Sequence, residues 1–165
     1  MTANNPLLIT TPDDQEIQRL SQLTITRELA APRSLVWRAW TEPQQFARWF
    51  GPRGFTISRI EFDVRPGGAI RADMRAPDGT IFTNLGSFTE VVAPERLEML
   101  LRYEQKGEVV FENLNTITLA ERDGNTLLTL DVRVIRATAS AAKYLVGMDA
   151  GWQQTLDRLT ETVTR

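Results

Sequence analysis

Acid–base chemistry in this chain would depend on its carboxylates and on two tyrosines, Tyr103 and Tyr144, because the 165 residues include no histidine and no cysteine. Without imidazole or thiolate groups there are no cysteine nucleophiles, disulfides, Ser–His–acid triads, or zinc and copper sites of the usual kind. Lysine is also scarce, with only Lys106 and Lys143. We therefore identify no catalytic residue, no metal site and no cofactor, and the composition argues against an enzyme without excluding one.

Large apolar side chains form a second group, which is suited to binding rather than to reaction. Aromatic residues commonly line ligand sites, and three of the four tryptophans lie close together at Trp37, Trp40 and Trp49. The alternative is that these side chains only pack short helices onto a sheet. As residues that line a ligand pocket we predict Trp40, Trp49, Phe50, Phe62, Met74, Phe88, Met148, Trp152 and Leu156.

The element that positions the last of these residues runs from about Ala139 to Thr164. Its apolar residues recur at steps of three and four, which is typical of one stripe on a long helix. They are Leu145, Met148, Trp152, Leu156, Leu159 and Val163. Gly147 and Gly151 flank this stripe. The two glycines leave room for a ligand, or allow close approach of a strand or a partner subunit, and we favour the second interpretation.

Upstream of this helix the pattern alternates with a period of two, which indicates strands. The first strand covers about Leu23 to Leu29, and Arg27 within it suggests an edge position. Two short helices follow, the first opening at 31–34, the second running from Pro43 to about Trp49 with Thr41 as its cap. Six further strands are predicted at Thr56–Val64, Ile70–Arg75, Thr80–Val92, Arg96–Tyr103, Val109–Glu121 and Thr126–Val134.

Short turns between these strands, such as Pro77-Asp78-Gly79, join antiparallel neighbours. One face of the sheet is apolar and must be covered, and only the final helix is long enough to cover it. The sequence thus predicts an α+β fold: a curved antiparallel sheet of about seven strands, two short helices after the first strand, and a long C-terminal helix wrapped by the sheet. Residues 1–20 are expected to form an arm or a short helix capped by Thr11, and residues 21–165 a single domain.

Polar residues inside the predicted strands have two interpretations. Glu112, Asn113 and Asn115 face either a cavity or solvent, and a solvent-facing row is the favoured interpretation. Arg71, Asp73 and Arg75 share a strand face that we also expect to be solvated.

The charge balance limits the partners of the protein. A net charge of −2 and a pI near 5.3 argue against nucleic acid and anionic membranes, which attract basic surfaces. No apolar run is long enough to span a bilayer, and no signal peptide is recognisable. We therefore expect a cytoplasmic protein, either monomeric or homodimeric.

Several motifs occur in an order that resembles a known family. They are Ile25-Thr26-Arg27-Glu28 with Ala31-Pro32, Val36-Trp37-Arg38-Ala39-Trp40-Thr41-Glu42-Pro43, Trp49-Phe50-Gly51-Pro52, Asp63-Val64-Arg65-Pro66-Gly67-Gly68, Pro77-Asp78-Gly79-Thr80, Pro94-Glu95-Arg96-Leu97 and Gly147-Met148-Asp149-Ala150-Gly151-Trp152. This pattern is similar to the family of activator-of-heat-shock-protein-ATPase homologues. The resemblance implies the START-like helix-grip fold of the SRPBCC superfamily, which includes lipid carriers, polyketide cyclases, hormone receptors and ring-hydroxylase subunits.

Three hypotheses for function remain open at this level. The favoured one is a non-enzymatic module that binds a small, largely apolar or aromatic molecule between the sheet and the final helix. The second is a protein-interaction module, either a homodimer or a co-chaperone-like partner. The third is a cyclase- or hydrolase-type enzyme that uses a carboxylate or a tyrosine.

Overall fold

The computed structural model describes residues 20–138 and 141–164, so the arm predicted at the N-terminus lies outside the described residues except for Leu20. Within this part of the chain, seven strands form one sheet and three helices accompany it. The strands are β1 (Gln22–Leu29), β2 (Thr56–Phe62), β3 (Ala69–Arg75), β4 (Ile81–Val92), β5 (Arg96–Gln105), β6 (Glu108–Arg122) and β7 (Asn125–Ala137). The helices are α2 (Arg33–Thr41), α3 (Pro43–Phe46) and α4 (Ala142–Val163). No described helix combines the length and apolar character needed to cross a membrane.

The strands β2 to β7 form an antiparallel meander, and β1 pairs with β7 at one end of it. The order of the sheet is β1-β7-β6-β5-β4-β3-β2, so β1 and β2 form the two edges. β1 pairs with β7, for example at Ile25 opposite Leu130. The predicted α+β helix-grip fold is confirmed, including the edge position of the first strand.

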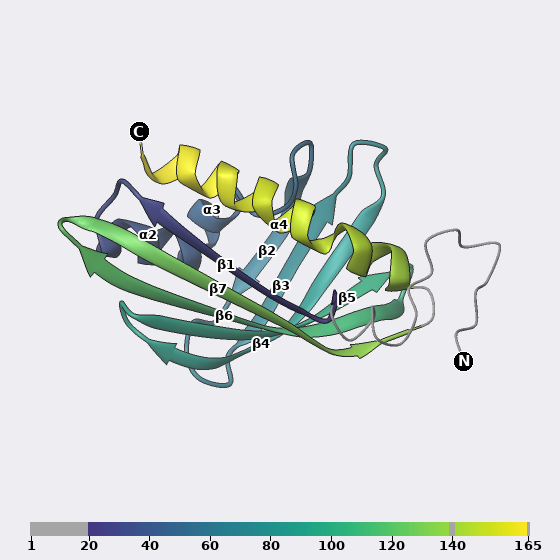
Figure 1. Ribbon diagram of the computed structural model, residues 1–165. Coiled ribbons are helices and arrows are strands. Elements are labelled where there is room, and N and C mark those ends of the chain that lie inside the picture. The colour runs from purple at the N-terminus through teal and green to yellow at the C-terminus, as the bar shows by residue number, and fades with distance from the viewer. Residues whose placement is uncertain (1–19, 139–140, 165) are drawn as a thin grey trace.

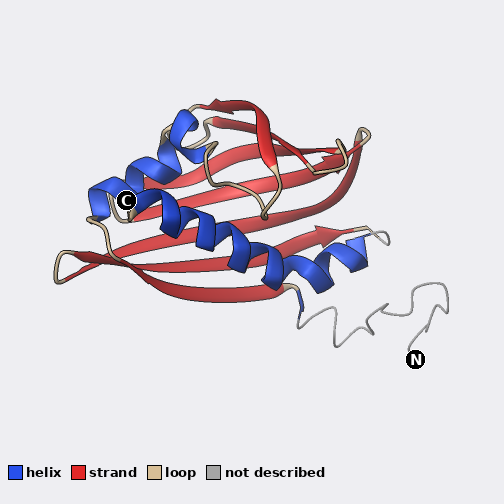
Figure 2. Cartoon of the chain, turned by 90° about the horizontal axis from the view of Figure 1, so that it is seen from above, coloured by secondary structure: helices blue, strands red, loops and turns tan. Residues whose placement is uncertain are grey.

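The sheet curves around α4, and the core lies between its concave face and the helix (Figures 1 and 2). A close approach between two strands falls at Gly86 in β4. A Cβ atom at this position would lie 1.7 Å from the carbonyl oxygen of Leu100 in β5. Any side chain there would force one of the two backbones to move, which explains why this strand interior holds a glycine.

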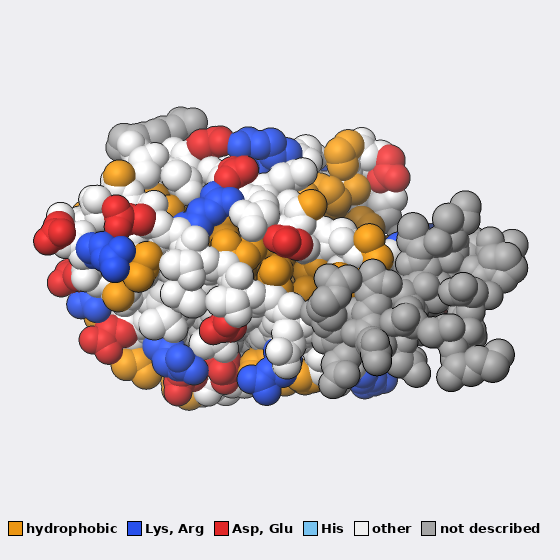
Figure 3. All heavy atoms as spheres, viewed as in Figure 1, with side chains coloured by type: hydrophobic (Ala, Val, Ile, Leu, Met, Phe, Trp, Pro, Cys, Tyr) orange, Lys and Arg blue, Asp and Glu red, His pale blue; other side chains and the backbone are white. Residues whose placement is uncertain are grey.

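The apolar stripe of α4 faces the sheet as its spacing predicts. Leu156 and Leu159 are 1% and 0% exposed, and Val163 at the helix end is also buried. These three residues belong to the main core, whereas Met148, nearer the start of the helix, is only partly buried. The apolar stripe is therefore fully buried in the second half of α4, whereas in the first half Leu145 and Trp152 are buried and Met148 is only partly so. Charged side chains of both signs are interspersed over the outer surface on this side of the molecule (Figure 3).

The two short helices carry an aromatic cluster that packs into one end of the core. The ring centroids of Trp40 and Trp49 lie 4.5 Å apart, and those of Phe46 and Phe50 lie 4.3 Å apart. The indole N–H of Trp49 donates to the carbonyl oxygen of Ala39 at 3.0 Å, which connects the turn after α3 to α2. This cluster is a packed core rather than an open surface.

The predicted cap of the second short helix is wrong. Because α2 continues through Thr41, the hydroxyl of Thr41 donates to the carbonyl oxygen of Trp37 at 2.8 Å, one turn earlier in the same helix. The residue before α3 is Glu42, and its side chain makes no capping hydrogen bond. α3 also ends at Phe46, earlier than predicted, and turns carry the chain on to Trp49.

Candidate functional site

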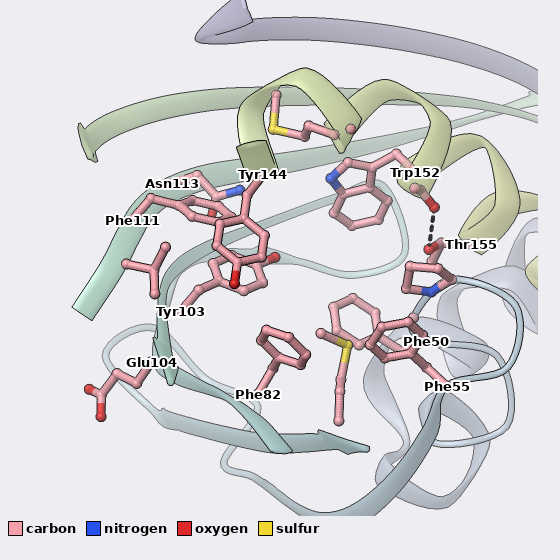
Figure 4. Close-up of a pocket in the computed structure, with 17 residues that line it drawn as sticks. Phe50, Phe55, Phe82, Tyr103, Glu104, Phe111, Asn113, Tyr144, Trp152 and Thr155 are labelled. Carbon is pink, nitrogen blue, oxygen red and sulfur yellow. Dashed lines mark hydrogen bonds between the residues drawn. The ribbon is translucent and has the colours of Figure 1, made fainter. Parts of the chain in front are cut away.

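A cavity of about 190 Å³ lies between the first half of α4 and the concave face of strands β3 to β6. Its wall is mainly aromatic (Figure 4). The aromatic residues of the wall are Phe50, Phe55, Phe82, Tyr103, Phe111, Tyr144 and Trp152. Well-packed interiors contain few voids larger than a water molecule, so a space of this size in an apolar setting is a candidate binding site.

Strand register brings the sheet side of the wall together. Alternate residues of a strand point to the same face, and in the register of β3 with β4 Met74 lies opposite Phe82. In the same way Tyr103 in β5 lies opposite Phe111 in β6, and their rings stack with centroids 4.4 Å apart. The Tyr144 ring of α4 closes over this group, with its centroid 6.1 Å from that of Phe82.

Two glycines form part of the helix side of the wall. A Cβ atom at Gly147 would have no atom within 4 Å, and one at Gly151 would meet only a side-chain atom of Pro52 at 3.7 Å. Within the described residues no strand approaches either position, so the favoured interpretation of close approach by a strand is wrong. The missing side chains instead leave room in the cavity beside Met148 and Trp152.

The loop after α3 supplies a third side of the wall through Gly51, Pro52 and Phe55. Arg158 of α4 holds this loop: its guanidinium donates to the carbonyl oxygens of Gly51 at 2.8 Å and Pro52 at 3.2 Å. Burial lowers the pKa of Arg158, and the positive charge of Arg53 lowers it further. Arg53 of the loop forms an ion pair with Glu161 of α4. Both arginines therefore connect the loop to the helix.

Polar side chains also face the cavity, and here the sequence interpretation needs correction. Asn113 and Asn115 are 1% and 0% exposed, so the expected solvent-facing row is wrong for both. They share strand parity with Ile117 and Leu119, whose side chains are in the core, whereas Glu112 has the opposite parity. The expectation of a solvated face also fails for Asp73, which is 9% exposed and pairs with Arg71 at 3.2 Å.

The hydroxyl of Tyr103 lies beside these amides. Burial raises the pKa of Tyr103 to about 12, and the side chains of Asn113 and Asn115 act in the opposite direction without cancelling it. The phenol is therefore protonated at neutral pH and can both donate and accept a hydrogen bond.

The residues that the sequence marks as pocket candidates separate into two groups in the structure. Phe50, Met74, Met148 and Trp152 lie on the wall of the cavity. Trp40, Trp49, Phe62, Phe88 and Leu156 lie in or against the packed core beside it. The aromatic cluster of the short helices accounts for this division, because Phe46 is in ring contact with Trp40, Trp49 and Phe62.

Other wall residues are absent from the predicted set of pocket residues: Phe55, Phe82, Tyr103, Val110, Phe111, Tyr144 and Thr155. For Asn113 the sequence allows a cavity position but favours solvent. Strand parity is the signal that could have found several of them. Tyr103 shares parity with Leu97, Met99 and Leu101, which are all buried. Phe55 lies in a loop, and no local pattern marks it.

The chemistry available on the described wall is apolar contact, ring stacking and hydrogen bonding. Glu104 is the one residue of the wall with a formal charge; its carboxylate lies 3.6 Å from the guanidinium of Arg102 and points away from the cavity (Figure 4). No group of acidic residues in the described ranges is arranged to hold a metal ion.

With this geometry in place, comparison with known proteins decides the family. Residues 30–164 match the family described as "Activator of Hsp90 ATPase homolog 1-like protein". The chain belongs to this family. A crystal structure of a protein from Nitrosomonas europaea is 32% identical over 87% of this chain and 94% of its own, with a TM-score of 0.72. A second, from Chromobacterium violaceum, is 30% identical over 88% of this chain and 98% of its own, with a TM-score of 0.74.

More distant members of the family share the fold alone. A crystal structure of the AHSA1 protein from Silicibacter pomeroyi is 19% identical, covers 85% of this chain and 95% of its own, and has a TM-score of 0.71. No match is found among curated proteins. The resemblance seen in the sequence motifs is thus confirmed, both for the family and for the helix-grip fold.

Proposed function

We propose that the protein binds a small, largely apolar molecule in the cavity between the sheet and the first half of α4. The observation that supports this most is the cavity itself: about 190 Å³ of space beside a buried aromatic core. An apolar cavity of about 150 Å³ is large enough to bind benzene. The space here therefore suits a ligand with one ring, or a short branched chain.

The two halves of α4 have different roles under this proposal. Leu156, Leu159 and Val163 stabilise the fold by packing on the sheet. Gly147 and Gly151 lower the intrinsic stability of the helix by about 1 kcal/mol each relative to alanine. Space for a ligand is a reason to keep glycine at both positions, since neither is in close contact with backbone.

The experiment is a screen of single-ring and two-ring aromatic compounds and of fatty acids, read out by thermal shift and by tryptophan fluorescence. Free ligand at a hundred times its Kd stabilises the native state by about 2.7 kcal/mol. For a domain of this size that corresponds to a rise in Tm of roughly 5–10 °C. Trp152 lies on the wall, so binding should also quench its fluorescence.

A matched pair of variants locates the binding. Gly147→Leu places a large side chain on the wall and should abolish both signals. Ala150→Leu adds the same bulk at an exposed position of the same helix and should leave them unchanged. The proposal fails if no compound gives a signal, or if Gly147→Leu binds as well as the wild type.

The enzyme hypothesis has weaker support. The ionisable groups on the described wall are Glu104, Tyr103 and Tyr144. Glu104 is near Arg102, and the hydroxyl of Tyr144 donates to the side-chain oxygen of Gln105 at 2.8 Å. A phenol is protonated at neutral pH, and burial raises the pKa of Tyr103 further, to about 12, so Tyr103 does not act as a base there.

A further inference from the structure

One small part of the cavity wall is polar, and it comes from two neighbouring strands. Tyr103 in β5 and Asn113 in β6 both line the cavity. Asn115, two residues further along β6, points to the same face and lies behind Asn113. Tyr103 lies opposite Phe111 in the strand register, so it is the diagonal neighbour of Asn113. Figure 4 shows the side chains of Tyr103 and Asn113 on the same side of the cavity.

The hydrogen bonds of the two amides are incomplete. The side-chain N–H of Asn113 donates to the side-chain oxygen of Asn115 at 3.2 Å. The Oδ1 atom of Asn113 and the Nδ2 atom of Asn115 have no partner among the described residues, although both side chains are at least 99% buried. Buried polar atoms in folded proteins nearly always have a partner. For Asn113, which lies on the wall, the cavity is the direction from which a partner can come.

The rest of the wall limits the charge of that partner. No lysine or arginine is among the residues that line the cavity. An anionic ligand would therefore lose its hydration without gaining a counter-ion, which is strongly unfavourable. For a cationic ligand, Glu104 is the one counter-ion on the wall, and its carboxylate points away from the cavity and lies near Arg102. The partner of Asn113 is thus a neutral group.

A hydroxyl group is the neutral group that suits both polar residues. It can donate to the Oδ1 atom of Asn113 while it accepts from the phenol O–H of Tyr103. If the amides of Asn113 and Asn115 are both turned by 180°, Asn115 donates to Asn113, and the same hydroxyl accepts from the NH₂ group of Asn113 instead. A ketone or an ether lacks the donor that Asn113 needs in the first orientation.

Deepening the proposed function, on which this inference rests, we propose that the ligand is a small neutral aromatic alcohol or phenol whose hydroxyl binds between Asn113 and Tyr103. Its ring lies against the aromatic part of the wall, including Phe82 and Trp152. The ligand class is defined by one ring, one hydroxyl group and no charge.

The test compares three probes of similar size by isothermal titration calorimetry: 4-ethylphenol, ethylbenzene and the 4-ethylbenzoate anion. The wild type should bind 4-ethylphenol about tenfold more tightly than ethylbenzene, the scale of one to two buried hydrogen bonds. It should not bind 4-ethylbenzoate measurably.

Two variants assign the preference to the polar residues. Tyr103→Phe and Asn113→Leu should both lower the ratio of the two affinities to near one, while ethylbenzene binding remains. Tyr144→Phe is the matched control, because Tyr144 also lines the cavity but directs its hydroxyl to Gln105. It should keep the tenfold preference.

The outcomes separate this inference from the proposed function. Equal binding of 4-ethylphenol and ethylbenzene by the wild type overturns the hydroxyl site and leaves the apolar ligand site standing. A preference that persists in Tyr103→Phe and Asn113→Leu also overturns it. Binding of neither probe, together with no hit in the wider screen, overturns both. The wild-type comparison needs no variant, so a variant that does not fold leaves the inference open to refutation.

Discussion

Replacement of Gly147 by alanine should stabilise the free protein and weaken ligand binding at the same time. Gly147 is an exposed residue inside α4, and a new Cβ atom would have no atom within 4 Å. The gain is therefore the intrinsic helix preference of alanine over glycine, about 1 kcal/mol. For a chain of this length the Tm should rise by roughly 2–4 °C.

The same methyl group takes up space on the wall of the 190 Å³ cavity. A ligand that fills the wild-type space then meets an overpacked site, which costs about 1 kcal/mol or more. The affinity for 4-ethylphenol should fall by at least about fivefold. Opposite changes in stability and in binding are what distinguish a residue kept for a ligand from one kept for the fold.

The assay combines urea denaturation of the free protein with calorimetric titration of 4-ethylphenol. Ala150→Gly is the matched control, because Ala150 is exposed on the same helix and does not line the cavity. It should lower the free energy of unfolding by about 1 kcal/mol and leave the affinity unchanged. The reasoning is refuted if Gly147→Ala destabilises the protein, or if it stabilises it with no effect on binding.

Three further predictions test the sheet, the loop and the buried tyrosine. Gly86→Ala should lower the free energy of unfolding by about 3 kcal/mol in urea denaturation, since its Cβ would lie 1.7 Å from the carbonyl oxygen of Leu100; a loss below 1 kcal/mol would contradict this. Arg158→Met should lower it by about 2 kcal/mol and weaken 4-ethylphenol binding, because the guanidinium holds the loop that carries Gly51 and Pro52. Arg53→Met, which removes an exposed and solvent-screened ion pair, should destabilise the protein clearly less than Arg158→Met, and equal losses would argue against a special role for Arg158. Burial raises the pKa of Tyr103 from 10.0 to about 12, so its contribution to stability is complete below pH 10 and is lost as pH rises from 10 to 12, by on the order of 2–3 kcal/mol. Urea denaturation at pH 9 and pH 11.5 should show this loss in the wild type and in Tyr144→Phe but not in Tyr103→Phe.

The order and type of the secondary structure could be predicted because they depend on local spacing. Alternation with a period of two, interrupted by Pro and Gly turns, places the strands within a few residues of their observed bounds. The stripe from Leu145 to Val163 likewise identifies α4 and its buried face. The end of α3 at Phe46 was harder to predict, because a short helix has few residues in its pattern.

The candidate site was only partly predictable, although some of the missing information was present in the sequence. Asn113 and Asn115 follow the parity of Ile117 and Leu119, and strict use of that parity would have turned them inward. Register outweighs polar character at these two positions, because the next residues on the same strand face are in the core.

Residue patterns along the chain are enough to indicate the family, the antiparallel meander and the helix that covers the sheet. The boundary between the packed core and the cavity is visible only in three dimensions. That boundary depends on the distance between a curved sheet and a straight helix, and on how the aromatic rings of separate elements meet. Trp49 and Trp152 have the same chemistry, yet the first is 0% exposed in the core and the second lies on the cavity wall. The three-dimensional distance between elements distinguishes them, and no local pattern records it.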